Sequence, residues 1–407
     1  MLNGAAAPPL LRRLNATRVL TELRASGPLR VTELVELTGF SRPTIESIAD
    51  DLVGLGWASE SVIEAGQRRG RPARELTFRA DGGVVLGVDV GVGRVTLIAA
   101  DLAGDVRAER SEALDSALGA PDRLARVVEL ARETIGVAGF PLYSLMRAVV
   151  GSPGIVDAES GIVMQSPTLP GWNGLHLGEE LSAALGCAVQ VENDANLAAE
   201  GERWRGVGEG IRDLVFVLAG ERLGAGIVVD GRTVRGYAGG AGEMGFTQLF
   251  ATGQGSEGIG ALGREAGRDA LRRLLADSDA ADSGQLLRSL AGDDPGQVNV
   301  ELLLEAARLG DTVARDVLED ILAGVARAIA VLAILLNPQL IVVGGAVADA
   351  AGQILPPLRE GVSQLTLLPT RIEASVLSHR AVALGAVHAA VEATLEELVE
   401  REAPIRA

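Results

Sequence analysis

The chain changes character at about residue 84, and this change limits its fold more than any other feature. Before it, apolar residues recur at helical spacing from Leu11 to Leu23. After it, valine-rich segments such as VVLGVDV and VTLIAAD alternate with glycine turns, and amphipathic segments follow. Strands mixed with crossover helices predict an α/β body. A chain of 407 residues has room for a small N-terminal domain over residues 1–80 and a larger one over 81–407.

The segment from residue 10 to 57 has the pattern of a helix, a short helix, a glycine turn and a capped helix. Ser41 is a good N-cap after the turn at Gly39, and Pro43 fits the first turn that follows. Two short strands around a basic glycine turn come next, up to about residue 80. The pattern predicts a winged helix-turn-helix, and a small helical dimerisation domain is the alternative. Four arginines in the wing favour DNA binding: Arg68, Arg69, Arg71 and Arg74.

Charge is distributed unevenly along the chain. The formal net charge of −17 argues against a nucleic-acid binder, but residues 1–80 hold 11 arginines against 9 acidic residues. A locally basic head is therefore joined to a strongly acidic body. Because a nearly neutral head releases few counterions, useful affinity for double-stranded DNA requires two heads. We expect a homodimer or homotetramer on a palindromic operator.

Composition excludes several classes of protein. Cys187 is the single cysteine, which rules out an internal disulfide framework and any multi-cysteine metal site. The longest apolar run, near residues 328–336, is about half of a membrane span. The N-terminus lacks the order of charged and apolar regions that marks a signal peptide. We expect a cytoplasmic protein with no membrane partner.

Five motifs follow one another along the body: GVDVGVG (residues 87–93), GSPGIVD (151–157), ENDAN (192–196), GGAGEMG (239–245) and NPQLIVVGG (337–345). Each is weak alone, but their order over about residues 84–395 resembles the ROK family of repressors and sugar kinases. The resemblance implies a two-lobed, actin-like (ribonuclease-H-like) ATPase fold. Lobe one then covers about residues 84–198 plus a C-terminal helix at about 383–401, and lobe two covers about 199–382.

The resemblance also implies a sugar site. Asp194, at a strand end that enters a helix, is placed to accept a proton from a sugar hydroxyl. Asn193 and Glu243 supply the donors and acceptors that distinguish hydroxyl groups. Read from the residues alone, Asn193 and Asp194 equally serve as caps of the following helix. Trp172 either stacks on a sugar face or belongs to the core. The expected ligand contacts are Gly154, Thr168, Asn193, Asp194 and Glu243.

The nucleotide loops depart from the family pattern. The first phosphate loop of family kinases reads Asp-x-Gly-Gly-Thr, whereas here Val92 obstructs close approach to a phosphate and Gly93 lacks the hydroxyl. In the second loop, Glu221 adds a negative charge and Arg222 fills a glycine position. We therefore expect no efficient phosphoryl transfer and no bound cofactor, with residual nucleotide affinity left open. The degenerate loops comprise Asp89, Gly91, Gly93, Gly220, Gly224, Gly344 and Gly345.

The zinc region of the family departs as well. Phe246 stands where family members have a histidine, and the following GQGSEGIGALGRE contains no cysteine. The glutamate that follows the last zinc-region cysteine in family members falls near Arg264 in this chain. We expect no metal site.

The capped helix of the head carries the residues expected to reach DNA in the major groove: Ser41, Arg42, Thr44 and Ser47. In the wing, Arg69 and Arg71 flank a glycine in the tetrapeptide Arg-Gly-Arg-Pro. We expect this flat segment to enter an A·T-rich minor groove, the alternative being phosphate contacts alone.

Three hypotheses follow. The leading one is a transcriptional regulator, a repressor of carbohydrate-related genes, whose acidic body senses a sugar or sugar derivative. The second is an active sugar kinase with an appended DNA-binding head. The third is a regulator whose body serves only for dimerisation.

Overall fold

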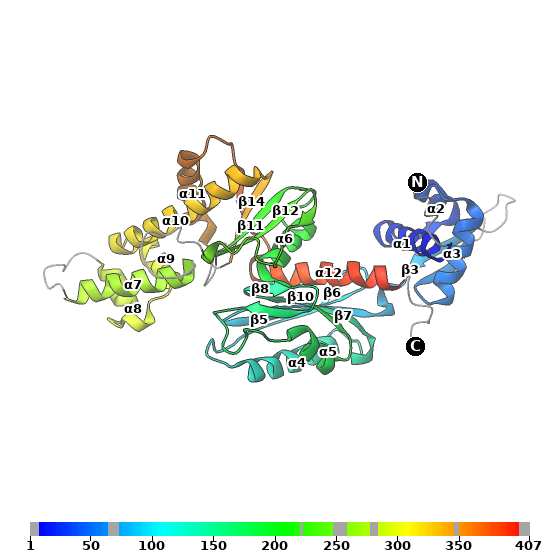
Figure 1. Cartoon of the computed structure of the whole chain (residues 1–407), viewed down its shortest axis with the longest axis horizontal. Coiled ribbons are helices and arrows are strands. Elements are labelled where there is room, and N and C mark those ends of the chain that lie inside the picture. The colour runs from blue at the N-terminus through cyan, green and yellow to red at the C-terminus, as the bar shows by residue number, and fades with distance from the viewer. Residues whose placement is uncertain are drawn as a thin grey trace.

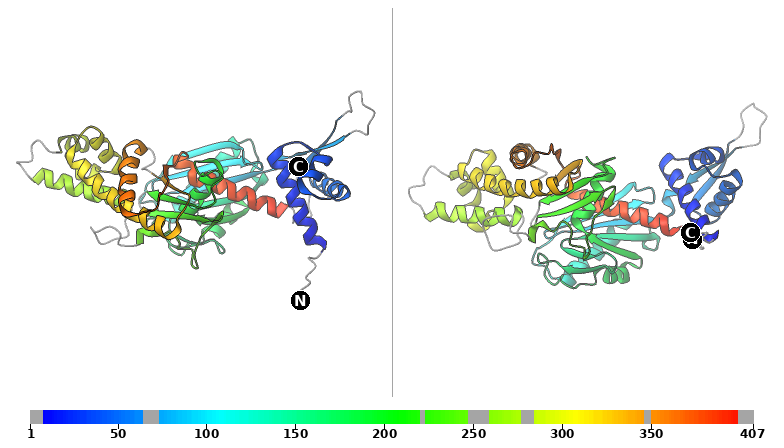
Figure 2. Two further views of the ribbon diagram at one scale, coloured as in Figure 1. Left: turned by 90° about the horizontal axis from the view of Figure 1, so that it is seen from above. Right: turned by 45° about the horizontal axis from the view of Figure 1, so that its top comes forward.

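The computed structural model describes residues 8–63, 73–219, 223–246, 259–276, 284–345 and 350–398. A small N-terminal head lies at one end, a body of two sheets lies in the middle, and a group of helices lies at the far end (Figures 1 and 2). The fold is α/β with a winged helix-turn-helix head, as the sequence predicts.

The head forms around a small sheet of strand order β1-β3-β2. Gly39 adopts the left-handed conformation (φ 72°) that ends the second helix. Ser41 caps the third, where its Oγ accepts the Thr44 N–H at 3.4 Å. The prediction of a helix, short helix, turn and capped helix is thus confirmed. The elements are α1 (Pro8–Ser26), β1 (Leu29–Arg30), α2 (Val31–Thr38), α3 (Arg42–Gly54), β2 (Ala58–Ile63) and β3 (Ala73–Phe78).

The first sheet of the body has the strand order β10-β7-β4-β5-β6. Strands β4, β7 and β10 are parallel, and β5 and β6 extend the sheet as antiparallel strands. Their bounds are β4 (Val84–Val90), β5 (Arg94–Asp101), β6 (Val106–Ala113), β7 (Leu145–Ser152) and β10 (Ala188–Asn193), with helices α4 (Ala120–Val137) and α5 (Leu177–Leu185) and the hairpin β8 (Ile155–Asp157) and β9 (Ile162–Gln165).

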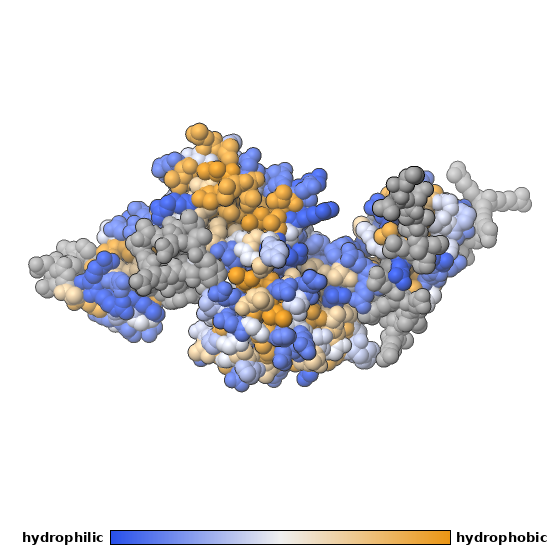
Figure 3. Space-filling view, in the orientation of Figure 1, coloured by the Kyte–Doolittle hydropathy of each residue, from blue (hydrophilic) through white to orange (hydrophobic). Residues whose placement is uncertain are grey.

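The second sheet has the strand order β13-β12-β11-β14-β15. It comprises β11 (Leu214–Ala219), β12 (Leu223–Val229), β13 (Arg232–Thr233), β14 (Leu340–Gly344) and β15 (Ile372–Ala374). Its helices are α7 (Ile259–Ala276), α8 (Gln285–Ala291), α9 (Val300–Arg308), α10 (Thr312–Leu336) and α11 (Ala351–Leu365). Exposed apolar side chains gather over α10 and α11 (Figure 3), namely Val331, Ile334, Leu335 and Leu365, with Leu367 just beyond.

Two helices pack between the sheets: α6 (Asp194–Arg205) and α12 (Ala381–Leu398). Glycine makes their close approach possible, because a Cβ on Gly385 would lie 1.8 Å from the Leu197 carbonyl oxygen and one on Gly201 2.3 Å from that of Ala381. From this crossing, α12 runs to the head (Figure 1). There its buried residues join those of α1 in one apolar cluster, and Arg24 pairs with Glu392 at 2.6 Å.

The sequence of residues 111–120 and 275–298 is typical of loops or linkers, but both segments contain regular structure. Strand β6 extends to Ala113 within the predicted linker at 111–120, and α8 lies within 275–298. The charged sequence VRAERSEA of β6 lacks the apolar pattern of a buried strand. The reason is that β6 lies at the edge of its sheet, where most of its side chains are exposed to water. No helix in the described part of the chain is long and apolar enough to cross a membrane.

Candidate functional site

The candidate ligand site lies where β10 ends and α6 begins. Asn193 is the last residue of β10 and pairs in parallel register with Ser152 of β7. It is also the N-cap of α6, where its Oδ1 accepts the Asn196 N–H at 3.1 Å. The carboxyl ends of parallel strands therefore meet here, which is where ligands bind in open α/β sheets.

Asn193 joins three segments that lie far apart in the sequence. Its Nδ2 donates to the Gly154 carbonyl oxygen at 2.9 Å and to Glu243 Oε1 at 3.2 Å. Gly154 has φ +99°, and a Cβ there would lie 2.1 Å from the Gln165 carbonyl oxygen. The structure thus brings together Gly154, Asn193 and Glu243, and it shows that the capping role of Asn193 coexists with these contacts.

Asp194 begins α6, where its Oδ1 accepts the Ala195 N–H at 2.8 Å. Burial raises the pKa of Asp194 well above its ordinary value, and the negative charges of Asp89 and Glu243 raise it further. Burial also raises the pKa of Asp89, at the end of β4, to about 7. A carboxyl group held in its neutral form can donate a hydrogen bond to a ligand, and once ionised it is a stronger base than an ordinary carboxylate.

The loop after β9 supplies further polar groups. The hydroxyl oxygens of Ser166 and Thr168 are buried and have no hydrogen-bond partner among the described residues. Such hydroxyls are available to a ligand or to water. Trp172, by contrast, is fully buried in the core of lobe one, and its Nε1 donates to Ser152 Oγ at 2.9 Å. The core alternative is therefore correct for Trp172, and the stacking role is not.

A buried arginine, Arg123, supports the first phosphate loop. Its role was not predicted from the sequence. Arg123 of α4 is fully buried and donates to the carbonyl oxygens of Gly91, at 3.0 Å, and Asp115, at 2.9 Å. Burial lowers its pKa. The signal was its helical spacing with the apolar residues Val127 and Leu130 on the buried face of α4.

Among the glycines of the nucleotide loops, Gly91, Gly344 and Gly345 have structural roles. A Cβ on Gly91 would lie 2.8 Å from the Arg94 carbonyl oxygen, whereas Gly93 has open space. Gly344 allows the Phe216 ring to pack against β14, and Gly345 has φ +83°. Gly224 makes only ordinary contact with Ala195. Val92 packs against the apolar core of lobe one. Gly220, Glu221 and Arg222 lie outside the described residues.

Within the described residues, no group of three histidine, cysteine, aspartate or glutamate side chains is arranged to hold a metal ion. The side chains of Phe246 and Arg264, and residues 247–258 between them, lie outside the described part of the chain.

The head presents the predicted recognition residues at the start of α3. Ser41, Arg42 and Ser47 are exposed and Thr44 is half-buried. Arg42 pairs with Glu46 at 2.9 Å, and Arg12 of α1 donates to Ser47 Oγ at 3.2 Å.

The wing is described only at its base. Arg74 on β3 does not belong to a free basic tip, because it pairs with Asp50 and Glu60 at 2.7 and 3.0 Å. Arg68, Arg69 and Arg71 lie outside the described residues.

Comparison with known proteins extends this picture. The xylose repressor of Caldicellulosiruptor bescii is 27% identical over 387 residues, which cover 93% of this chain and 95% of that protein. A ROK family transcriptional regulator described as a homolog of the E. coli MLC protein has a similar structure, with a TM-score of 0.75 and 26% identity over 96% of this chain and 100% of its own.

A ROK family glucokinase from Streptomyces griseus, solved in complex with glucose and AMPPNP, has a TM-score of 0.64 and 27% identity. It covers 76% of this chain and 100% of its own. The ROK family profile matches residues 85–392, which is most of the chain. The two-lobed body is thus that of a member of the ROK family, to which this chain belongs.

Proposed function

We propose that this protein is a DNA-binding transcriptional regulator, a repressor of carbohydrate-related genes, that works in the cytoplasm. Residues 1–80 form the DNA-binding head, and residues 81–407 form the two-lobed sensor. It binds a palindromic operator in double-stranded DNA as a homodimer or a higher homo-oligomer. Its effector is a sugar or sugar derivative.

The extent of the similarity to other proteins carries this proposal. The xylose repressor and the ROK regulator match nearly the whole chain, head included. The glucokinase matches 76% of it, although all of the glucokinase is covered. The difference corresponds in size to the head. There the N-cap Ser41 and the α3 residues Arg42 and Ser47 are exposed, as contact with a major groove requires.

The sensor role rests on the contacts of Asn193. They connect lobe one, through Gly154, with lobe two, through Glu243. A ligand that contacts Asn193, Asp194 and Glu243 stabilises one arrangement of the lobes. It changes DNA binding only by the difference between its affinities for the two arrangements. The buried hydroxyls of Ser166 and Thr168 offer further hydrogen bonds to a sugar.

The apolar patch over α10 and α11 supports self-association. Val331, Ile334 and Leu335 form an exposed stripe at the end of α10, next to Leu365 and Leu367. Large exposed apolar side chains in one place are typical of protein–protein contacts. A two-fold pairing of bodies provides the two heads that a palindromic operator requires.

The test is operator binding by the full chain, measured by fluorescence anisotropy with and without each sugar of a panel. We expect one sugar to shift the operator affinity. Asp194→Asn should abolish that shift and leave sugar-free DNA binding unchanged, because Asp194 lies in the body. Equal DNA affinity for the full chain and for a chain without residues 1–80 would refute the proposal.

A second candidate, sugar phosphorylation, is favoured by one observation. The raised pKa of Asp194 suits a base that accepts a hydroxyl proton. Against it stand Val92 and Gly93 in the first phosphate loop, because phosphoryl transfer depends on positioning and charge stabilisation of the phosphates. A coupled assay with ATP and a panel of hexoses distinguishes the two. Turnover that Asp194→Asn abolishes would establish the kinase.

A further inference from the structure

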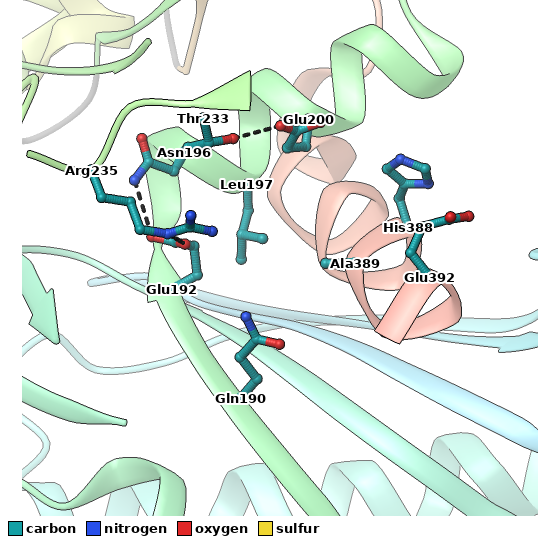
Figure 4. Close-up of a pocket in the computed structure, with 10 residues that line it drawn as sticks. All are labelled: Gln190, Glu192, Asn196, Leu197, Glu200, Thr233, Arg235, His388, Ala389 and Glu392. Carbon is teal, nitrogen blue, oxygen red and sulfur yellow. Dashed lines mark hydrogen bonds and ion pairs between the residues drawn. The ribbon is translucent and has the colours of Figure 1, made fainter. Parts of the chain in front are cut away.

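A cavity of about 190 Å³ lies at the junction of the two lobes, apart from the candidate ligand site at Asn193 and Asp194 (Figure 4). Its walls come from β10 of lobe one, from β13 and Arg235 of lobe two, and from helices α6 and α12 between them. At about 30 Å³ per water molecule, its volume accommodates several waters or one small organic molecule.

One wall contains a residue with a buried acceptor that lacks a donor among the described residues. Asn196 is 2% exposed, and its Nδ2 donates to Glu192 Oε1 at 3.0 Å, while its Oδ1 accepts no hydrogen bond from any described residue. Rotating the amide by 180° does not solve this, because Glu192 Oε1 is itself an acceptor that already takes the Asn193 N–H at 2.9 Å. This oxygen is itself shielded from solvent, so the polar groups that a guest molecule can contact are those of the other lining residues, among them Glu192, Arg235 and Gln190.

The charges around the cavity are balanced. Three carboxylates reach it, and each is matched by an arginine: Glu192 by Arg235 at 2.6 Å, Glu200 by Arg203 at 2.8 Å and Glu392 by Arg24 at 2.6 Å. Neither an organic cation nor an anion finds an unpaired counter-charge here. The carboxylates retain free lone pairs, and Arg235 and Gln190 supply N–H donors. A hydroxyl group donates and accepts at once, so several hydroxyls on one molecule satisfy this lining.

We propose that this cavity is a second binding site, for a small uncharged polyhydroxy molecule, separate from the site at Asn193 and Asp194. The hydroxyls donate to the carboxylates, and they accept from Arg235 and Gln190. Binding of such a molecule depends only on the residues that line the cavity. Its consequence for DNA binding rests on the proposed function as a regulator.

The position of the cavity connects it with both functional ends of the molecule. Glu192 binds the Asn193 N–H of the first site, and Glu392 of α12 binds Arg24 of the head. Both lobes contribute walls, so lobe closure changes the shape of the cavity. A guest molecule that contacts Glu392 competes with Arg24 for its carboxylate, and this competition alters how the head is held.

The test titrates the full chain with xylitol and erythritol in a calorimeter. Asp194→Asn disables the first site, and Ala389→Leu fills the cavity from α12. Ala393→Leu is the matched control, one turn further along α12 and outside the cavity lining. We expect polyol binding to persist in Asp194→Asn and Ala393→Leu and to weaken by at least about tenfold in Ala389→Leu.

A second variant and a fluorescence signal distinguish loss of the binding site from misfolding of the protein. Gln190→Leu removes a polar group from the β10 wall, and it should weaken binding as well. Trp204 stacks on His388 of the cavity wall, with ring centroids 5.2 Å apart, so its fluorescence should change on binding.

The possible outcomes separate the site from the regulator function. Binding that Ala389→Leu and Gln190→Leu leave unchanged, or no binding of either polyol at millimolar concentration, would mean that the cavity holds water only and would overturn the proposal. Polyol binding that Ala389→Leu abolishes, together with an unchanged operator affinity, would support the site and contradict its link to the head.

Discussion

Replacing Gly385 by alanine tests whether the crossing of α6 and α12 sets the architecture of the body. The new Cβ would lie 1.8 Å from the Leu197 carbonyl oxygen, whereas ordinary contact begins at 3.4 Å. Backbone atoms must move to relieve this overlap, so the upper part of the overpacking range, about 3 kcal/mol, applies. The better helix propensity of alanine returns up to about 1 kcal/mol. We expect a net loss of about 2–3 kcal/mol in the free energy of unfolding.

Thermal unfolding followed by circular dichroism measures this loss. At about 2–4 °C per kcal/mol for a unit of this size, the melting temperature should fall by roughly 4–12 °C. Gly136→Ala is the matched control, because Gly136 is an exposed glycine in the last turn of α4 with open space at its Cβ position. It should leave the melting temperature unchanged or raise it slightly. A Gly385→Ala variant that melts at or above the wild-type temperature would refute the argument.

Three further predictions concern Arg42 of the head, Asp89 beside the candidate ligand site, and Arg123 below the first phosphate loop. Arg42→Ala should weaken operator binding by about 1–3 kcal/mol if Arg42 reads a base, measured by anisotropy; an equal loss on random DNA would show a phosphate contact instead. Folding raises the pKa of Asp89 to about 7, so the wild-type protein should lose stability relative to Asp89→Asn as the pH rises from about 4 to about 7. A difference in melting temperature that is constant over this range would contradict the burial of the carboxyl group. Arg123→Met removes the donor to the Gly91 carbonyl oxygen and leaves the Asp115 carbonyl oxygen with the Leu118 N–H alone. It should therefore lower the free energy of unfolding by about 1–3 kcal/mol in urea titrations; an unchanged midpoint would show that the loop does not depend on this arginine.

Local sequence signals predicted much of the molecule. The turn at Gly39 and the cap at Ser41 identified the head, since both act within a few residues along the chain. The motif around Asn193 and Asp194 likewise located the candidate site. The residues there depend on a strand end and a helix start that are adjacent in the sequence.

Roles that depend on burial were harder to assign. Arg123 looks like a surface residue of an amphipathic helix until α4 packs on the first sheet and encloses it. Trp172 was left between a ligand contact and the core, and only its packing shows that it belongs to the core. Strand β6 escaped notice because an edge strand with most of its side chains in water lacks the apolar signal of a central one.

The sequence by itself determined the order of the elements, the head, the family and the residues at the start of α6. Only the tertiary structure decided which distant groups meet. Arg24 and Glu392 pair although 368 residues separate them, and Glu192 meets Arg235 across the lobes. The physical reason is that helix caps, turns and strand patterns arise from interactions between neighbours in the chain. Ion pairs, cavities and buried polar groups arise from packing between segments whose separation the sequence does not encode locally.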